Sequence, residues 1–260
     1  MHRKGSETMS TSMTKGNPLK LMLQFALPLL IGNLLQQTYN IIDAAIVGQI
    51  LGAKALASVG ASSSVQFLVL GFCMGCCTRF GVPVAKYFGA DKMDTMRNYV
   101  FNGAVLTGGI GVTVTILCSV FCPQILHLLS VPEDIFRGAY HYLLIIFLGI
   151  PFTLLYNYLS SILRSLGDSR TPFLFLAFSA ILNIFLDLFC IVILKWGCAG
   201  AAAATITAQA ISGILCLVFI GRKMNVLHLT KENRMVNITA VKELLAMGLP
   251  TGLQFSITAI

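Results

Sequence analysis

The sequence carries very little charge for its length. Only 11% of its 260 residues are Asp, Glu, Lys or Arg, whereas 56% are hydrophobic. A soluble chain of this size needs more polar surface to cover its core. Histidines number only four, and no phosphate-binding loop, nucleophile elbow or zinc signature occurs in the sequence. The composition therefore excludes a soluble globular protein, and we expect neither enzymatic activity nor a bound cofactor.

The apolar residues form charge-poor runs that are long enough to cross a bilayer, which takes about 20 residues of helix. The runs lack the period-two alternation of a barrel wall. We therefore predict an all-α polytopic membrane protein with six complete spans and the start of a seventh near residue 242. The six predicted spans cover residues 19–45, 55–78, 98–121, 139–163, 173–194 and 197–220.

The distribution of Lys and Arg predicts the orientation in the membrane. Of the 18 basic residues, only Lys54, Arg137 and Lys195 fall in the loops of one side. The positive-inside rule then places the N-terminus in the cytoplasm of a plasma (inner) membrane protein. The net charge of +8 is thus a topology signal, and no nucleic-acid partner is expected. The first run is too long for a signal peptide and lacks a small-residue cleavage site, so we expect it to be a retained helix.

A short internal similarity suggests two repeats. At an offset of 222 residues, Leu23, Leu27 and Pro28 match Leu245, Leu249 and Pro250. Six helices, a basic connector and a restarted first helix are typical of a transporter with parallel repeats. We expect a protein about twice this long, of which the chain contains a cytoplasmic tail at 1–17, an N-lobe at 18–221, a connector at 222–241 and a truncated first helix of the C-lobe at 242–260.

Three of the eight cysteines lie close together in the second predicted span. Cys73, Cys76 and Cys77 form the segment CMGCC, which overlaps Gly71-x-x-x-Gly75. Inside a membrane, cysteine behaves as a small apolar residue, and small residues allow helices to approach closely. We therefore predict helix packing here rather than a metal or redox site.

Two carboxylates lie at membrane depth, and these are Asp43 and Asp187. Each would cost on the order of 2.5–3.5 kcal/mol facing lipid at mid-bilayer, so each should face a cavity or a partner. Gln36 and Tyr39 lie within about 20° and 40° of Asp43 around a helix, and Asn183 precedes Asp187 by one turn. Such oxygen ligands suit a hard cation or a proton relay. The alternative is that these polar groups only hold helices together.

Pro28 interrupts the hydrogen bonding of the first predicted helix, 15 residues before Asp43. A proline in a helix interior removes one backbone hydrogen bond and bends the helix. We consider Pro28 a candidate hinge, with a static kink as the alternative.

Several segments together resemble one transporter family. They are LPLLIGNLLQQTYNIIDAAIVGQILGAKALASVG at 27–60, FGADK at 88–92, LRSLGDSRTP at 163–172, NIFLD at 183–187 and GAAAAT at 200–205. In order and spacing they resemble the multidrug and toxic compound extrusion (MATE) family. The resemblance implies a monomeric twelve-helix transporter with two lobes around a cavity, of which this chain would hold the six-helix N-terminal bundle. It also implies export of amphipathic, often cationic organic compounds in exchange for Na⁺ or H⁺.

The resemblance further implies roles for individual residues. The cation site would consist of Asp43, Asn183, Asp187 and Thr205, and Na⁺ would be the only metal ion bound there. Gln36, Tyr39 and Asn157 would line the cavity, and Pro28 would be the point at which the first helix bends.

The resemblance and the residues also suggest a mechanism. Desolvation and mutual repulsion favour protonation of the two carboxylates or Na⁺ binding between them. Bending at Pro28 would then shrink the cavity and expel a cationic substrate, as alternating access requires.

Two other functions remain open at this stage. A flippase for lipid-linked oligosaccharides would need cationic residues lining its cavity, and Arg79 is the only candidate; the alternative for Arg79 is that it reaches the membrane interface. A membrane-embedded enzyme acting on lipids would need a nucleophile, a metal cluster or a catalytic dyad at the rim. Besides organic substrates, membrane lipids are the expected partners.

Overall fold

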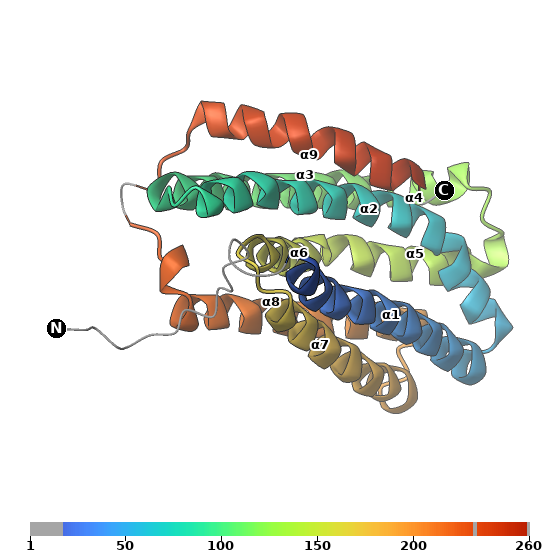
Figure 1. The fold of residues 1–260 in the computed structure, drawn as a ribbon. Coiled ribbons are helices and arrows are strands. Elements are labelled where there is room, and N and C mark those ends of the chain that lie inside the picture. Colours follow the sequence, from blue (N-terminus) through green and yellow to red (C-terminus); the bar gives the residue numbers. More distant parts are fainter. Residues whose placement is uncertain (1–17, 231–232, 259–260) are drawn as a thin grey trace.

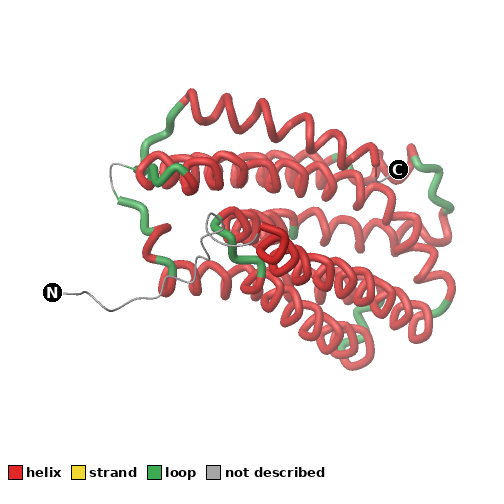
Figure 2. The backbone as a smooth tube through the Cα atoms, in the orientation of Figure 1, coloured by secondary structure: helices red, strands yellow, loops and turns green. Residues whose placement is uncertain are grey.

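The computed structural model describes residues 18–230 and 233–258, so the predicted tail at 1–17 lies outside the described residues. The described part is helical, without a strand (Figures 1 and 2). Its elements are α1 (Pro18–Leu51), α2 (Ala53–Gly89), α3 (Met93–Val120), α4 (Cys122–Leu128), α5 (Glu133–Leu148), α6 (Ile150–Ser165), α7 (Arg170–Leu188), a π-helical segment (Phe189–Ile193), α8 (Cys198–Lys223), a 3₁₀ turn (Asn225–Leu227) and α9 (Ile238–Thr258).

The described helices confirm the all-α membrane fold. Five are long and apolar enough to cross a bilayer, and the count becomes six when the bent pair of α5 and α6 is taken as one span. The span predicted over 139–163 corresponds to the pair of α5 and α6, which meet at an angle of 47°. Pro151, at the start of α6, has no N–H to continue the α5 ladder, and its ring would clash with the carbonyl four residues earlier. Gly149 lies between the two helices, and its lack of a side chain leaves room for Ile206, because an added Cβ would lie 2.1 Å from the Ile206 side chain.

Helices α2 and α9 lie side by side along one edge of the bundle (Figure 1). An added Cβ on Gly75 would lie only 2.7 Å from the carbonyl oxygen of Thr251, and one on Gly252 would lie 2.8 Å from Cys76 Sγ. Small residues on both helices therefore let the two backbones approach. The hydroxyl of Ser256 adds a hydrogen bond of 2.9 Å to the Leu68 carbonyl.

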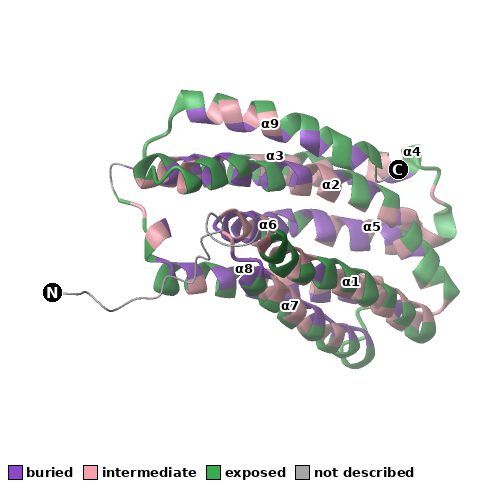
Figure 3. Ribbon diagram, in the orientation of Figure 1, coloured by how far each residue is buried: buried purple, intermediate pink, exposed green. Residues whose placement is uncertain are grey.

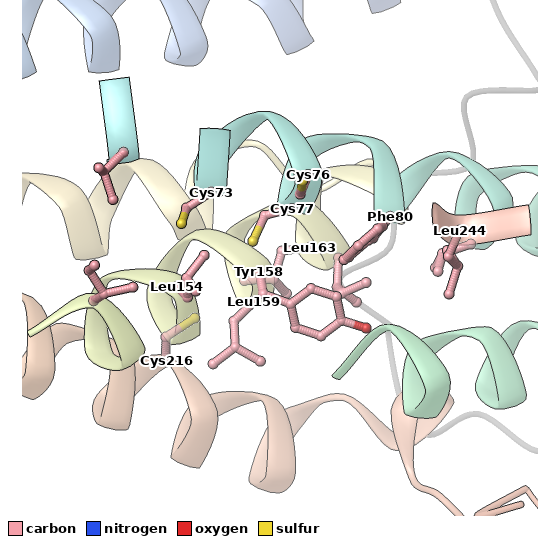
Figure 4. Packing of buried hydrophobic residues seen from close by; sticks show 14 of the residues in the cluster. Cys73, Cys76, Cys77, Phe80, Leu154, Tyr158, Leu159, Leu163, Cys216 and Leu244 are labelled. Carbon is pink, nitrogen blue, oxygen red and sulfur yellow. The ribbon is translucent and has the colours of Figure 1, made fainter. Parts of the chain in front are cut away.

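The main apolar core lies between α2, α3, α5, α6, α8 and α9. Cys73, Cys76 and Cys77 are at most 1% exposed and pack beside Phe80 and Tyr158 (Figure 4). The three sulfurs thus occupy core volume, in agreement with the packing interpretation of the CMGCC segment.

Burial is uneven across the bundle (Figure 3). Helix α6 is central and largely buried, with α2, α3 and α8 packed around it. Helix α1 packs against α7 and α2 but leaves much of its apolar surface exposed. One side of α1 therefore faces the space between the helices, and the other faces outward.

The segment that joins α8 to α9 is held by α3. Asn102, which is fully buried, accepts a hydrogen bond of 2.9 Å from the backbone N–H of Asn237. Asn98 donates one of 2.9 Å to the Met235 carbonyl. The side chain of Tyr99 bonds to Glu243 in the first turns of α9. These contacts fix where α9 begins relative to α3.

Candidate functional site

An acidic pair links α1 and α7. The carboxyl groups of Asp43 and Asp187 lie close enough to share a hydrogen bond when one of them is protonated. Asp187 is fully buried, and neither of its oxygens has a partner within the described residues. No Lys or Arg of the described part forms an ion pair with either carboxylate. Since ionised carboxylates only accept hydrogen bonds, the pair requires a proton or a cation between its members.

Asn183 extends this pair toward α8. Its Nδ2 donates to Thr205 Oγ1 at 3.3 Å, which orients its Oδ1 away from the hydroxyl. That Oδ1 is buried without a partner in the described part of the chain, as is Oδ1 of Asp43. Unpaired carboxylate and amide oxygens are the ligands that a hard cation prefers. All four residues predicted for the cation site thus come together from three helices.

The helical geometry changes directly after Asp187. Helix α7 ends at Leu188 and continues as the π-helical segment Phe189–Ile193. Short π-helical turns alter the hydrogen-bond ladder and occur frequently at functional sites. Here the segment lies against α8, where an added Cβ on Gly200 would be 3.2 Å from the Cys190 carbonyl oxygen.

A cavity of about 1130 Å³ opens between α1, α2, α6, α7 and α8. This volume is slightly above the range of about 300–1,000 Å³ that is typical of sites for drug-sized molecules. Seven of the predicted residues line it, namely Pro28, Gln36, Tyr39, Asp43, Asn157, Asn183 and Thr205. Asp187 does not line the cavity, because it is fully buried. The side chain of Tyr39 lies beside Gln36 and Gln209.

A stripe of polar residues on α6 lines the cavity. Its members are Thr153, Tyr156, Asn157, Ser160, Ser161, Arg164 and Ser165. Of these, only Asn157 was predicted from the sequence to line the cavity. Successive members are three or one residues apart, which is the pattern of a single helical face. That spacing was the signal in the sequence. The stripe runs over 13 residues from Thr153 to Ser165, or roughly 18 Å of helix.

Arg79 does not line the cavity. Its Nε instead donates to Thr251 Oγ1 at 2.9 Å, across the contact of α2 with α9, and its side chain is exposed. The idea that Arg79 is the only cationic candidate for the cavity was therefore wrong. Arg164 occupies that role, because the polar face of α6 points inward whereas Arg79 lies on the face of α2 that meets α9.

Comparison with known proteins places this arrangement in a family. The MatE family model matches residues 28–189. The probable multidrug resistance protein YpnP of Bacillus subtilis is 34% identical over 244 residues, which cover 94% of this chain and 54% of that protein. The probable multidrug resistance protein NorM of Thermotoga maritima is 29% identical, over 90% of this chain and 51% of that protein.

Solved structures agree on the fold. An outward-facing multidrug resistance MATE family transporter of the MOP superfamily superposes with a TM-score of 0.89 at 24% identity, over 97% of this chain and 56% of that one. A MATE structure in the straight conformation gives a TM-score of 0.87 at 25% identity, over 95% and 55%. The chain thus spans about half the length of the relatives it matches. With its helical lobe, its cavity and the match over residues 28–189, the chain belongs to the MatE family of multi-pass membrane proteins.

Proposed function

We propose that this chain forms the first lobe of a cation-coupled antiporter, which exports amphipathic, often cationic organic compounds in exchange for Na⁺ or H⁺. The observation that carries the proposal is the acidic pair of Asp43 and Asp187, brought together from α1 and α7 without a counter-charge in the described residues. The names of the relatives support multidrug export as the process. In this proposal the N-terminus lies in the cytoplasm and the protein lies in the plasma membrane.

Ion entry is coupled to substrate export because the ion and the cationic substrate compete for binding to the lobe. A cation or a proton bound between the carboxylates offsets their repulsion, whereas the empty pair attracts a cationic substrate to the cavity. Ion entry then lowers the affinity for the substrate, and the energy of the ion gradient is transferred through this difference in binding.

Pro28 is the hinge in this mechanism. It lies within α1, which runs from Pro18 to Leu51 as one helix, and it lines the same cavity as Asp43. Because Pro28 removes one hydrogen bond from the ladder, bending of α1 is least costly there. A bend at Pro28 changes the volume of the cavity and thereby couples ion binding to substrate release.

The test is calorimetric titration of the purified chain with Na⁺ at several pH values. Asp187→Asn should abolish Na⁺ binding and the proton release that accompanies it. Asp91→Asn is the matched control, because Asp91 is exposed in the turn between α2 and α3 and its positive φ of 56° is tolerated by Asn. Unchanged Na⁺ binding by a folded Asp187→Asn protein would refute the coupling role of the pair.

A further inference from the structure

The cavity carries opposite charges toward its two ends. Arg164 lies near the C-terminal end of α6, and only a short turn separates it from the start of α7 at Arg170. Asp187 follows 17 residues later on α7, which is roughly 25 Å along the helix axis. The acidic pair and the guanidinium are thus separated by most of the length of the lobe.

Arg164 has no counter-charge of its own in the described chain. Its guanidinium forms neither an ion pair nor a hydrogen bond within the described residues, although the side chain is partly buried and lines the cavity. Asp168 forms no ion pair with it. Oδ1 of Asp168 instead accepts hydrogen bonds from the backbone N–H groups of Arg170 and Thr171. A partly buried guanidinium without an anion is costly unless a bound group supplies one.

A buried hydroxyl lies one turn from Arg164. Ser160, on the same stripe, lines the cavity and is only 2% exposed. Its Oγ lies near the Tyr156 hydroxyl but forms no hydrogen bond of good geometry within the described residues. A carboxylate or phosphate oxygen placed here would accept hydrogen bonds from both side chains. Arg is well suited to this because its planar group binds such anions through two donors.

We propose that Arg164 and Ser160 form an anion subsite that binds the carboxylate or phosphate of an amphipathic ligand. This inference rests on the proposed transport function and specifies its substrates. A zwitterionic amphiphile would place its cationic end toward Asp43 and its anionic end at Arg164. The same chemistry serves an anionic lipid headgroup, which competition by phosphatidylglycerol distinguishes from a soluble ligand.

Two fluorescent probes test the subsite, because they differ only at a carboxyl group. Rhodamine 110 carries a free carboxylate, and rhodamine 123 is its methyl ester. Binding of each to the purified 260-residue chain is measured by fluorescence anisotropy. Arg164→Gln should raise the Kd of rhodamine 110 by about tenfold or more, as expected for the loss of a charged hydrogen bond. The Kd of rhodamine 123 should change by less than about twofold. Because Lys keeps the positive charge, Arg164→Lys should weaken rhodamine 110 less than Arg164→Gln does.

Arg170→Gln is the matched control, since Arg170 is exposed, carries the same charge and does not line the cavity. It should leave both Kd values unchanged. The proposal is overturned if Arg164→Gln weakens both probes equally, if it weakens neither, or if rhodamine 110 does not bind the folded chain. If phosphatidylglycerol displaces rhodamine 110 from the wild-type chain but not from Arg164→Gln, the anion is that of a lipid headgroup. If phosphatidylglycerol does not displace rhodamine 110 from the wild-type chain, the anion belongs to a soluble ligand.

This experiment does not depend on ion coupling. Asp187→Asn tests the proposed function by Na⁺ titration, whereas the comparison of the two rhodamines requires no ion gradient and no transport. If Arg164→Gln does not selectively weaken rhodamine 110 while Asp187→Asn abolishes Na⁺ binding, the anion subsite is refuted and the proposed function stands. If Arg164→Gln selectively weakens rhodamine 110 while Asp187→Asn leaves Na⁺ binding unchanged, the proposed function is refuted and the anion subsite stands.

Discussion

Gly75 of α2 and Gly252 of α9 approach so closely that an added Cβ on Gly75 would lie 2.8 Å from Gly252 Cα. The atoms on the α9 side are backbone atoms, which cannot turn away as a flexible side chain would. The contact of α2 with α9 is therefore set by the absence of side chains at these positions.

We expect Gly75→Ala to destabilise the protein by about 1–3 kcal/mol, because the new methyl group must push α9 away from α2. Thermal unfolding in detergent measures this as a lower midpoint. Gly60→Ala is the control, since Gly60 lies in the same helix and an added Cβ there meets nothing within 4 Å. A Gly75→Ala protein as stable as Gly60→Ala would contradict the tight contact.

The hydroxyl of Thr205 orients Asn183, and its removal should weaken ion binding. Thr205→Val keeps the shape of the side chain but leaves Asn183 Nδ2 without the acceptor that it has at 3.3 Å. We expect Na⁺ affinity to fall by about tenfold, since one hydrogen bond is worth on the order of 1 kcal/mol and the freed amide can rotate. Calorimetric titration measures the change.

Thr207→Val serves as the control for that substitution, because Thr207 is exposed on the same helix. Equal Na⁺ affinities of the Thr205→Val and Thr207→Val proteins would exclude Asn183 and Thr205 from the cation site.

The connector before α9 should loosen when Asn102 is replaced. Asn102→Ala removes the acceptor for the Asn237 N–H and the donor to the Met235 carbonyl, so two hydrogen bonds between α3 and the connector are lost. We expect trypsin to cut several-fold faster after Arg234, which is exposed in this connector. Asn225→Ala, at an exposed position of the same connector, should leave the rate unchanged. If both variants are cut at the wild-type rate, Asn102 does not hold the connector.

Thiol labelling distinguishes the core from the cavity. Cys77 is 1% exposed in the core, whereas the adjacent Thr78 is exposed and lines the cavity. A charged methanethiosulfonate reagent should therefore modify Thr78→Cys rapidly and the native cysteines of the CMGCC segment only after unfolding. Mass spectrometry counts the modified sites. Rapid modification of Cys77 in the folded protein would contradict its place in the core.

The sequence by itself determined the class of fold. Uniformly apolar runs of membrane length can be satisfied only by helices, because a bilayer offers no partner for backbone groups. The same physics singles out Asp43 and Asp187, since a carboxylate is costly inside the membrane unless it has a role there. Helical spacing put Asn183 one turn from Asp187, whereas Thr205 followed only from resemblance to a family, and the structure joins Asn183 and Thr205 by a hydrogen bond.

Only the tertiary structure decided which side of each helix faces the cavity. A membrane helix is apolar on several faces, so hydropathy does not separate lipid contacts from helix contacts. From the sequence, Arg79 could line the cavity or reach the membrane interface, and it bonds to α9 instead; Arg164 counted only as one of the basic residues that set the topology, and it lines the cavity. At the bend between α5 and α6, Pro151 is a local signal, whereas the close approach of Ile206 to Gly149 joins residues far apart in the chain and is encoded by no local pattern.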